Sequence, residues 1–375
     1  MALTITESVK HKVAAIFNHL HVHGEISMQE VKTTAYVNNI LTGLGYRTQT
    51  FTDCPGVIAE IGSGKPVVAL RADMDALWQT VNGNLQANHS CGHDAHMAIV
   101  LGAAMLLKNI PLTHGTIRLI FQPAEETGQG ALAICHHGCV DDLDYLYGVH
   151  LRPAEETKDK HAKPAILSSA CRTFFGTIDG EDAHAARPQL GKNSIEVAAA
   201  VIESISRIHL DPLIPSSIKM TNLHAGTASN IIPGHATFTL DARAQNNKLM
   251  DQLTESVEQM IASIAEGYGV SIDLVHSPGS PAATSSHEAI AIMGEAIKAV
   301  LGEANCDTPI PSGGGDDFHQ YAVYKPRIHS TMLGLGCDLK PGLHHPEMTF
   351  NHEAMYDGVS ILATAVANTI EVISK

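Results

Sequence analysis

Two apolar runs, VVALRAD (67–73) and TIRLIFQ (116–122), flank a longer apolar segment, HMAIVLGAAMLLKNI (96–110). The runs have the length and β-branched content of buried strands, whereas the segment between them is apolar on nearly all sides, which is typical of a packed helix. A further strand-like run, YLYGVHL, follows at 145–151. Strands separated by helices predict an α/β fold in which a mixed, mainly parallel sheet is flanked by helices.

Residues 172–280 have a different rhythm, because several of their strand-like stretches alternate apolar and polar residues. We expect four strands and two helices in the order β-α-β-β-α-β, at 172–180, 193–210, 217–226, 235–244, 247–269 and 270–277. This order is the split βαβ unit of a ferredoxin-like α+β sandwich.

The remaining elements return to the first pattern. We expect a helix at 287–302, a strand at 331–336 and a last helix at about 353–374. The simplest domain organisation is therefore one α/β domain in two parts, 1–171 and 281–375, with the α+β domain, 172–280, inserted between them. An insertion of this kind can act as a lid or as a dimerisation domain, and we expect a homodimer.

Composition excludes several classes of function. The 375 residues carry 24 Lys and Arg against 39 Asp and Glu, a formal charge of −15. This acidic balance argues against a nucleic-acid partner, which needs clustered positive charge. Apolar runs are too short to span a membrane. The first twenty residues resemble an amphipathic helix rather than a signal peptide, so a cytoplasmic location is expected. Seven scattered cysteines are not a disulfide framework.

Polar residues gather where the predicted parallel strands end. Asp73 and Asp75 follow the first strand, Glu125 and Glu126 follow the second, and His150 lies in the third. Reactive groups of α/β proteins collect at the carboxyl ends of strands.

The segment NHSCGHDAH (88–96) is the strongest local signal. Cys91 and His93 are two residues apart, so both can face one cation while Gly92 lets the backbone turn closely. An isolated Cys-x-His is equally consistent with a buried cysteine beside solvated histidines. The pair Glu125 and Glu126 adds a possible ligand and a possible proton acceptor, although adjacent glutamates usually mark a solvated helix face.

Two more histidines, His150 and His344, each follow a Gly-apolar pair. Alone, each is more often a core or loop residue than a ligand. Taken with Cys91, His93 and the glutamates, however, they supply enough ligands for two divalent ions.

The motifs that carry these residues are similar to those of the dinuclear metallo-amidohydrolase and carboxypeptidase family, which includes hippurate hydrolases, indole-acetyl-amino-acid hydrolases and aminoacylases. They are LRADMDAL (70–77), HSCGHDAHMA (89–98), FQPAEETGQGA (121–131), YGVHLRP (147–153) and LHHP (343–346). The segments LWQTVNG (77–83) and ARPQLGKNSIE (186–196) resemble the bacillus-type amidohydrolase X branch.

The resemblance implies a role for each matching residue of the metal centre. Cys91 would be a thiolate shared by two metal ions, and Glu125 would be the general base. Asp75 would orient an imidazole or another ligand. The remaining metal ligands would be His93, Glu126, His150 and His344. The ions would be Zn, Mn, Ni or Co, among which the sequence does not choose.

In the inserted domain, the resemblance implies that His184 and Asn230 bind substrate, with Arg243 as a partner for an anionic group. GTASN (226–230) is also consistent with a simple tight turn, and His184 with a surface loop. The family histidine often acts in the partner subunit's site. Two departures from the family pattern are Trp78, where relatives commonly have Pro, and Asp316, where they commonly have Glu.

The leading hypothesis is a metal-dependent amidohydrolase that cleaves the amide bond of small-molecule N-acyl amino acids. A metal-bridging hydroxide would attack, with Glu125 acting first as general base and then as general acid. The alternative on the same scaffold is a carboxypeptidase or dipeptidase. A catalytically silent metal-binding protein is a third reading, which the presence of Glu125 disfavours.

Overall fold

A seven-stranded sheet forms the centre of the larger unit of the chain, in the order β1-β2-β6-β3-β7-β17-β8. Neighbouring strands from β6 to β17 run parallel, and the outer strands pair antiparallel. The strand bounds are β1 Arg47–Thr50, β2 Val57–Ser63, β3 Val67–Asp73, β6 Gly115–Gln122, β7 Tyr145–Pro153, β8 Ala162–Lys163 and β17 His329–Leu339. The α/β fold with a mixed, mainly parallel sheet is thus confirmed.

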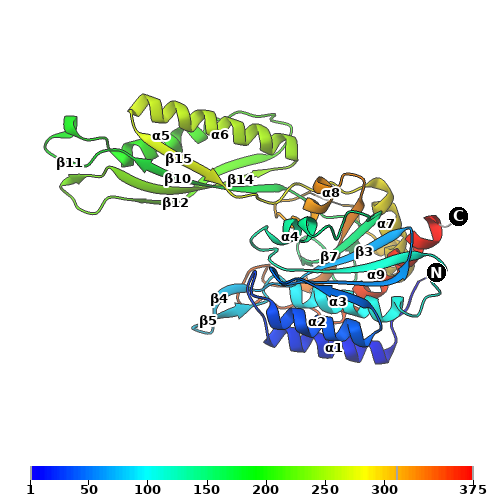
Figure 1. Cartoon of the computed structure of the whole chain (residues 1–375). Coiled ribbons are helices and arrows are strands. Elements are labelled where there is room, and N and C mark those ends of the chain that lie inside the picture. The colour runs from blue at the N-terminus through cyan, green and yellow to red at the C-terminus, as the bar shows by residue number, and fades with distance from the viewer. Residues whose placement is uncertain (1, 310, 374–375) are drawn as a thin grey trace. The chain divides into compact units, whose positions relative to one another are not determined.

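The computed structural model describes residues 2–309 and 311–373, which divide into two compact units (Figure 1). The inserted unit comprises Ser168–Ala283 and Pro311–Gly315, and the larger unit comprises the other described residues. The expected boundaries, 172 and 280, lie within a few residues of these limits. The short segment Pro311–Gly315, which the expected organisation places in the α/β domain, clusters with the inserted unit.

Helices cover both faces of the large sheet. Every residue of β3 is buried, because Val68 and Leu70 pack toward one helical layer while Val67 and Ala69 pack toward the other. The first layer consists of α1 Glu7–Val22, α3 His93–Leu107, α7 His287–Leu301 and α9 Ala354–Ile373. The second contains α4 Gly130–His136 and α8 Gln320–Tyr324. Helix α2, Val31–Gly43, packs beside β1 and β2.

Strand register explains why the polar residues meet. In the parallel pair β3 and β6, Asp73 lies opposite Gln122, and β7 continues the same edge with His150. The loops that follow β3 and β6 therefore begin side by side, and they carry Asp75 and the two glutamates. The last predicted helix ends at about residue 374, which lies outside the described residues.

The inserted unit has a four-stranded antiparallel sheet in the order β12-β14-β10-β15. The elements are β10 Ala170–Asp179, α5 Ser194–Ile205, β12 Ser216–Ala225, β14 His235–Ala244, α6 Asn247–Tyr268 and β15 Ser271–His276. This is the expected β-α-β-β-α-β topology. Side chains of Asn193 and Asn246 cap α5 and α6, and Gly269 ends α6 in a left-handed conformation.

A β-hairpin that the sequence pattern did not predict projects from the larger unit (Figure 1). It consists of β4, Leu77–Val81, and β5, Asn84–Asn88. Trp78 lies on β4 opposite Ala87, and the residue is 58% exposed. Within residues 2–309 and 311–373, no helix combines the length and the apolar character that a membrane crossing requires.

Candidate metal centre

Cys91 and His93 lie at the start of α3, where the chain makes a tight approach to β7. Gly92 between them has a φ of +89°, and a Cβ atom there would lie 2.9 Å from a methyl group of Leu151. Glycine alone fits this position without strain. Both Cys91 and His93 are buried, so the turn holds their side chains beneath the surface.

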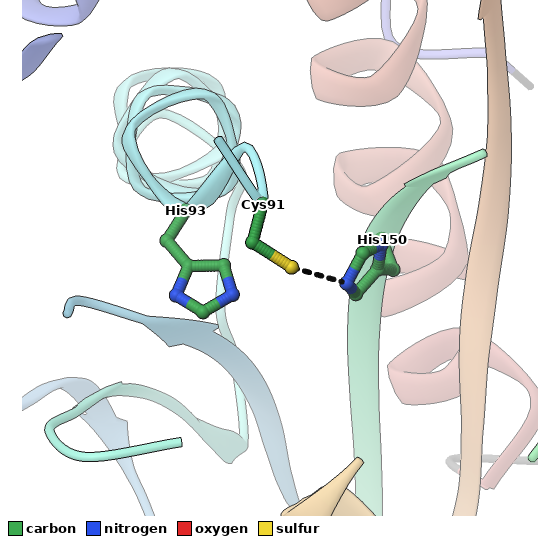
Figure 2. A group of neighbouring side chains, drawn as sticks. All are labelled: Cys91, His93 and His150. Carbon is green, nitrogen blue, oxygen red and sulfur yellow. Dashed lines mark hydrogen bonds between the residues drawn. The ribbon is translucent and has the colours of Figure 1, made fainter. Parts of the chain in front are cut away.

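His150 reaches the same point from β7 (Figure 2). Its Nε2 lies 3.6 Å from Cys91 Sγ, and its Nδ1 lies 2.7 Å from the carbonyl oxygen of Leu151. The second contact favours the tautomer in which Nδ1 carries the hydrogen, so Nε2 keeps its lone pair. Burial lowers the pKa of His150 well below the usual value, which keeps the ring neutral, as a metal ligand must be.

The expected ligands form two trios that share Cys91. In one trio Cys91 meets His93 and His150, and in the other it meets Glu126 and His344. Within each trio the potential ligand atoms lie within 4.8 Å of one another. The structure therefore brings all five expected metal ligands together, with the sulfur common to both groups.

Two buried atoms in this cluster are left without hydrogen bonds. Among the described residues, neither His93 Nε2 nor Glu126 Oε1 has a hydrogen-bond partner, although the two atoms are 3.9 Å apart. Buried polar atoms are normally satisfied. A divalent cation would satisfy both, because imidazole nitrogen and carboxylate oxygen are suitable ligands. The donor set therefore fits a metal ion.

Asp75 organises the residues around the cluster. The Nδ1 atom of His93 lies 2.9 Å from the carbonyl oxygen of Asp75 and 3.3 Å from its carboxylate. That carboxylate also accepts the backbone N–H groups of Glu125 and Glu126, each at 3.1 Å, and the hydroxyl of Ser27 at 2.6 Å. One side chain thus orients an imidazole and fixes the backbone of both glutamates.

The Glu125 carboxylate lies beside the two trios. Its Oε2 is 4.0 Å from His93 Nε2, and Glu125, Glu126 and His93 form a further group of neighbouring ligand atoms. Burial raises the pKa of Glu125 well above its usual value, and the nearby carboxylate of Asp316 adds to the shift. A glutamate in such surroundings holds a proton more readily than a solvated one, which suits a group that must accept a proton and later return it.

His344 comes from a loop after β17, and its backbone is strained. Its φ is +64°, in the left-handed region that residues other than glycine rarely adopt. The His344 N–H donates to the carbonyl oxygen of Ser90 at 2.8 Å, and its Nε2 lies 3.4 Å from Glu126 Oε1. The loop is therefore tied to the residue that precedes Cys91.

A buried charged network beneath the cluster was missing from the sequence-based interpretation. Arg71 is fully buried and donates to Asp73 at 2.6 Å and to Asp317 at 2.7 Å. Asp73 in turn accepts from His96 Nδ1 at 2.7 Å, while His96 Nε2 accepts the Leu151 N–H at 3.0 Å. Both nitrogens of His96 are thus occupied, which makes it a support for the sheet edge rather than a ligand. An apolar strand pattern gives no sign that an arginine within it is buried in this way.

The expected substrate contacts belong to the inserted unit. His184, in β11 Ala183–His184, pairs with Ile231 of β13 Ile231–Ile232, and the Ala185 N–H donates to the Asn230 carbonyl at 2.9 Å. His184 and Asn230 thus lie close together, and both are exposed.

Arg243 lies elsewhere in this unit, on β14. Its Nε donates to Asp241 at 2.9 Å and its Nη1 donates to the carbonyl oxygen of Gly313 at 2.7 Å. The guanidinium thus has partners within the unit, and the substrate role of Arg243 stays a prediction.

Asp316, the other departure from the family pattern, belongs to the larger unit. It is buried and caps a short helical turn by accepting the Phe318 N–H at 2.8 Å. This carboxylate is close enough to Glu125 to raise its pKa.

With this geometry in place, comparison with known proteins identifies the family. The model of peptidase family M20/M25/M40 matches residues 69–368, which include the five expected ligands, Asp75 and Glu125. The chain belongs to this family. Members of the M20/M25/M40 family hydrolyse amide or peptide bonds, and this chain is such a hydrolase.

Individual relatives agree with this assignment. N-acetyl-L-cysteine deacetylase of Bacillus subtilis is 30% identical over 362 residues, covering 93% of this chain and 86% of that protein. N-acyl-L-amino acid amidohydrolase of Geobacillus stearothermophilus is 32% identical, over 72% of this chain and 76% of the relative.

A solved structure supports the same fold. The YxeP protein of Bacillus subtilis, described as a dinuclear metal-binding peptidase of the M20 family, superimposes with a TM-score of 0.81 at 26% identity. The match covers 97% of this chain and 99% of that one.

Proposed function

We propose that this M20/M25/M40 hydrolase removes the acyl group from N-acyl amino acids and holds two divalent ions to do so. The observation that carries the proposal is the pair of ligand trios that share Cys91, with the Glu125 carboxylate beside His93. The ligands would be Cys91, His93, Glu126, His150 and His344. Zn, Mn, Ni and Co all suit a set of thiolate, imidazole and carboxylate groups.

Two divalent ions at this site would act as Lewis acids on the amide and would lower the pKa of a bound water. The chain's own residues supply the proton transfers. Glu125 takes the proton from the attacking water and then delivers it to the nitrogen of the leaving amine, so one carboxylate serves as base and acid. Asp75 keeps Glu125 in place through the backbone N–H group that it accepts.

We infer that the inserted unit binds the substrate. His184 and Asn230 are exposed polar neighbours, suited to donate hydrogen bonds to an amide oxygen or a carboxylate. The same unit offers a surface for a homodimer, because β12 is an edge strand and Ile202 and Leu223 are exposed. The homodimer, the action of His184 in the partner's site and a cytoplasmic location stay predictions.

The substrate class is supported by the names of two relatives, both of which act on N-acylated amino acids. The alternative is a carboxypeptidase or dipeptidase on the same scaffold. These activities differ in the group on the acyl side of the amide bond, which is a simple acyl chain in one case and an amino acid in the other.

The test is amine release from a panel of N-acetyl, N-benzoyl and indole-acetyl amino acids beside a panel of dipeptides, with metal analysis of the same protein. We expect turnover of one or more acyl amino acids that chelation abolishes and metal addition restores. Faster release from dipeptides would favour the alternative. Metal-independent turnover would overturn the proposal, and metal binding without any turnover would favour the silent protein.

A further inference from the structure

A second group of metal-ligating side chains lies outside the centre described above. Asp53 and Cys54 follow β1, and His137 follows α4, yet their ligand atoms lie within 4.8 Å of one another. The donor types are those of the main centre, namely a carboxylate, a thiol and an imidazole. The proposed hydrolysis uses none of the three residues.

The two distances from His137 Nε2 in this group match the edges of a tetrahedral coordination sphere. Bonds of about 2.3 Å to sulfur and about 2.0 Å to nitrogen or oxygen imply tetrahedral edges of about 3.5 Å for S···N and about 3.3 Å for N···O. Here Cys54 Sγ lies 3.7 Å from His137 Nε2, and Asp53 Oδ1 lies 3.2 Å from the same nitrogen. For comparison, the Cys91 and His150 pair of the main centre is separated by 3.6 Å.

The imidazole is held in this orientation by its neighbours. The ring of His137 stacks on Phe51 with centroids 4.2 Å apart and planes inclined by 23°. One ring nitrogen, Nε2, therefore faces both the sulfur and the carboxylate. A neutral imidazole cannot make a full hydrogen bond to both groups from a single nitrogen, whereas a cation placed among the three groups would satisfy all of them.

We propose that Asp53, Cys54 and His137 form an additional metal site that takes a borderline divalent ion such as Zn²⁺. Three protein ligands leave one position open to water, in keeping with an Asp53 side chain that is 68% exposed. Burial raises the pKa of the Cys54 thiol to about 11, so an ion that binds there displaces a proton.

A bound ion would tie two separate segments together. It would join the loop after β1 to the end of α4, and this loop continues to Gly56, where an added Cβ atom would lie 3.2 Å from Pro123. Pro123 begins the turn that carries Glu125 and Glu126. The role of the additional site is thus structural: its ion would hold together two segments that pack next to that turn. The ion takes no part in the proposed hydrolysis.

The experiment compares metal uptake by matched variants. Metal-free wild type, Cys54→Ser and His137→Asn are dialysed to equilibrium against the same free Zn²⁺ concentration, and zinc is measured by elemental analysis. His136→Asn is the control, since it removes an adjacent exposed imidazole outside the cluster. We expect Cys54→Ser and His137→Asn each to bind one ion per chain fewer than wild type and His136→Asn.

Loading with Co²⁺ gives a second readout. Wild type minus Cys54→Ser should show a sulfur-to-metal charge-transfer band, because only wild type has this thiolate. Equal zinc uptake by wild type and both cluster variants, or a difference spectrum without such a band, would overturn the site. Because the readout is a difference between variants, it is independent of how many ions the main centre holds. Unchanged amide hydrolysis in Cys54→Ser would show that the main centre is intact.

Discussion

The side-chain amide of Gln79 donates a hydrogen bond to the backbone carbonyl oxygen of His344 at 2.8 Å. The amide oxygen of Gln79 accepts the hydroxyl hydrogen of Ser90, also at 2.8 Å. Gln79 lies on the hairpin β4–β5, and Ser90 precedes Cys91. One side chain therefore joins the loops that carry Cys91 and His344. It also helps to hold His344 in its left-handed conformation, a type of strain that costs about 1–3 kcal/mol.

We predict that Gln79→Ala weakens the binding of one metal ion, because His344 loses a support for its strained backbone. Loss of such a supporting contact typically lowers metal affinity or activity roughly 10- to 100-fold. Metal affinity, measured by titration of the metal-free protein, is the first readout, and the metal concentration that restores activity is the second. A purely structural role would lower thermal stability without changing either value.

The control is Gln86→Ala. Gln86 faces Gln79 across the hairpin and is exposed, so the same change of residue type leaves the two loops untouched. We expect near wild-type metal affinity in this variant. If Gln79→Ala and Gln86→Ala bind metal equally well, Gln79 does not position His344.

The β4–β5 hairpin could not be predicted from the sequence, whereas most of the other strands could. The strands β3, β6 and β7 were predictable because a parallel strand buried on both faces is a near-continuous apolar run. The elements of the inserted unit were predictable from period alone. LWQTV and NLQAN have only five residues each and few apolar ones, since the hairpin is partly exposed, so neither gives a clear strand signal.

In the candidate site, the ligands were likewise predictable from the sequence, and the contacts that support them were not. Cys91, His93 and the two glutamates stand in compact motifs. Strand register brings the loops with Asp75 and the glutamates together at one edge of the sheet, and the start of α3 adds Cys91 and His93 to this group. The support for the ligands comes from pairs remote in sequence, such as Gln79 with His344 and Asp75 with His93. No local sequence pattern predicts these contacts, because each of them forms between segments that only the folded chain brings together.

Glu125 and Cys91 should fail in different ways when they are replaced. We predict that Glu125→Gln keeps its metal and lowers kcat by about 100-fold or more, because the amide cannot take a proton from water. Cys91→Ala should instead lose metal, since both ligand trios depend on its sulfur. Elemental analysis and steady-state kinetics on the same samples separate the two effects.

Cys135→Ala serves as the matched control for the lost thiol. Cys135 is similarly buried in α4, but it lies outside both trios. The Cys135→Ala variant should be less stable than wild type but should have the same metal content. Full metal occupancy in Cys91→Ala would contradict a shared thiolate, and near-normal turnover in metal-loaded Glu125→Gln would remove Glu125 from the proton transfer.

Asp75→Asn is predicted to impair the site more than the loss of one hydrogen bond would suggest. The two carboxylate oxygens each accept one backbone N–H, from Glu125 and from Glu126, and the asparagine amide puts a donor in place of one of these acceptors. We expect kcat to fall roughly tenfold or more, together with weaker metal binding. Ser27→Ala is the comparison, since it removes a single contact to the same carboxylate, worth about 1 kcal/mol. Equal effects of the two variants would show that Asp75 does not organise the turn.

The buried carboxyl group of Glu30 should make the folding stability depend on pH. Glu30 is buried, and its Oε1 accepts the N–H of Ala124, the residue before Glu125, at 2.8 Å. Within the described residues its Oε2 has no hydrogen-bond partner. Burial raises the pKa of Glu30 from 4.5 to about 7. Between these two values the folded protein binds a proton that the unfolded chain has released, so folding stability declines as pH rises through this range.

Glu30→Gln removes this titration and keeps an acceptor for the Ala124 N–H. The variant and wild type should be nearly equally stable near pH 4.5, where Glu30 is neutral in the folded protein and only half ionised in the unfolded chain. Above pH 7 the variant should be more stable by up to about 3 kcal/mol, because its amide carries no buried charge. Urea unfolding of the metal-free proteins from pH 4.5 to pH 8 measures the difference, to which groups common to both chains contribute equally. A constant difference across this range would mean that Glu30 is ionised in the folded protein throughout, and that its burial does not control the pH dependence.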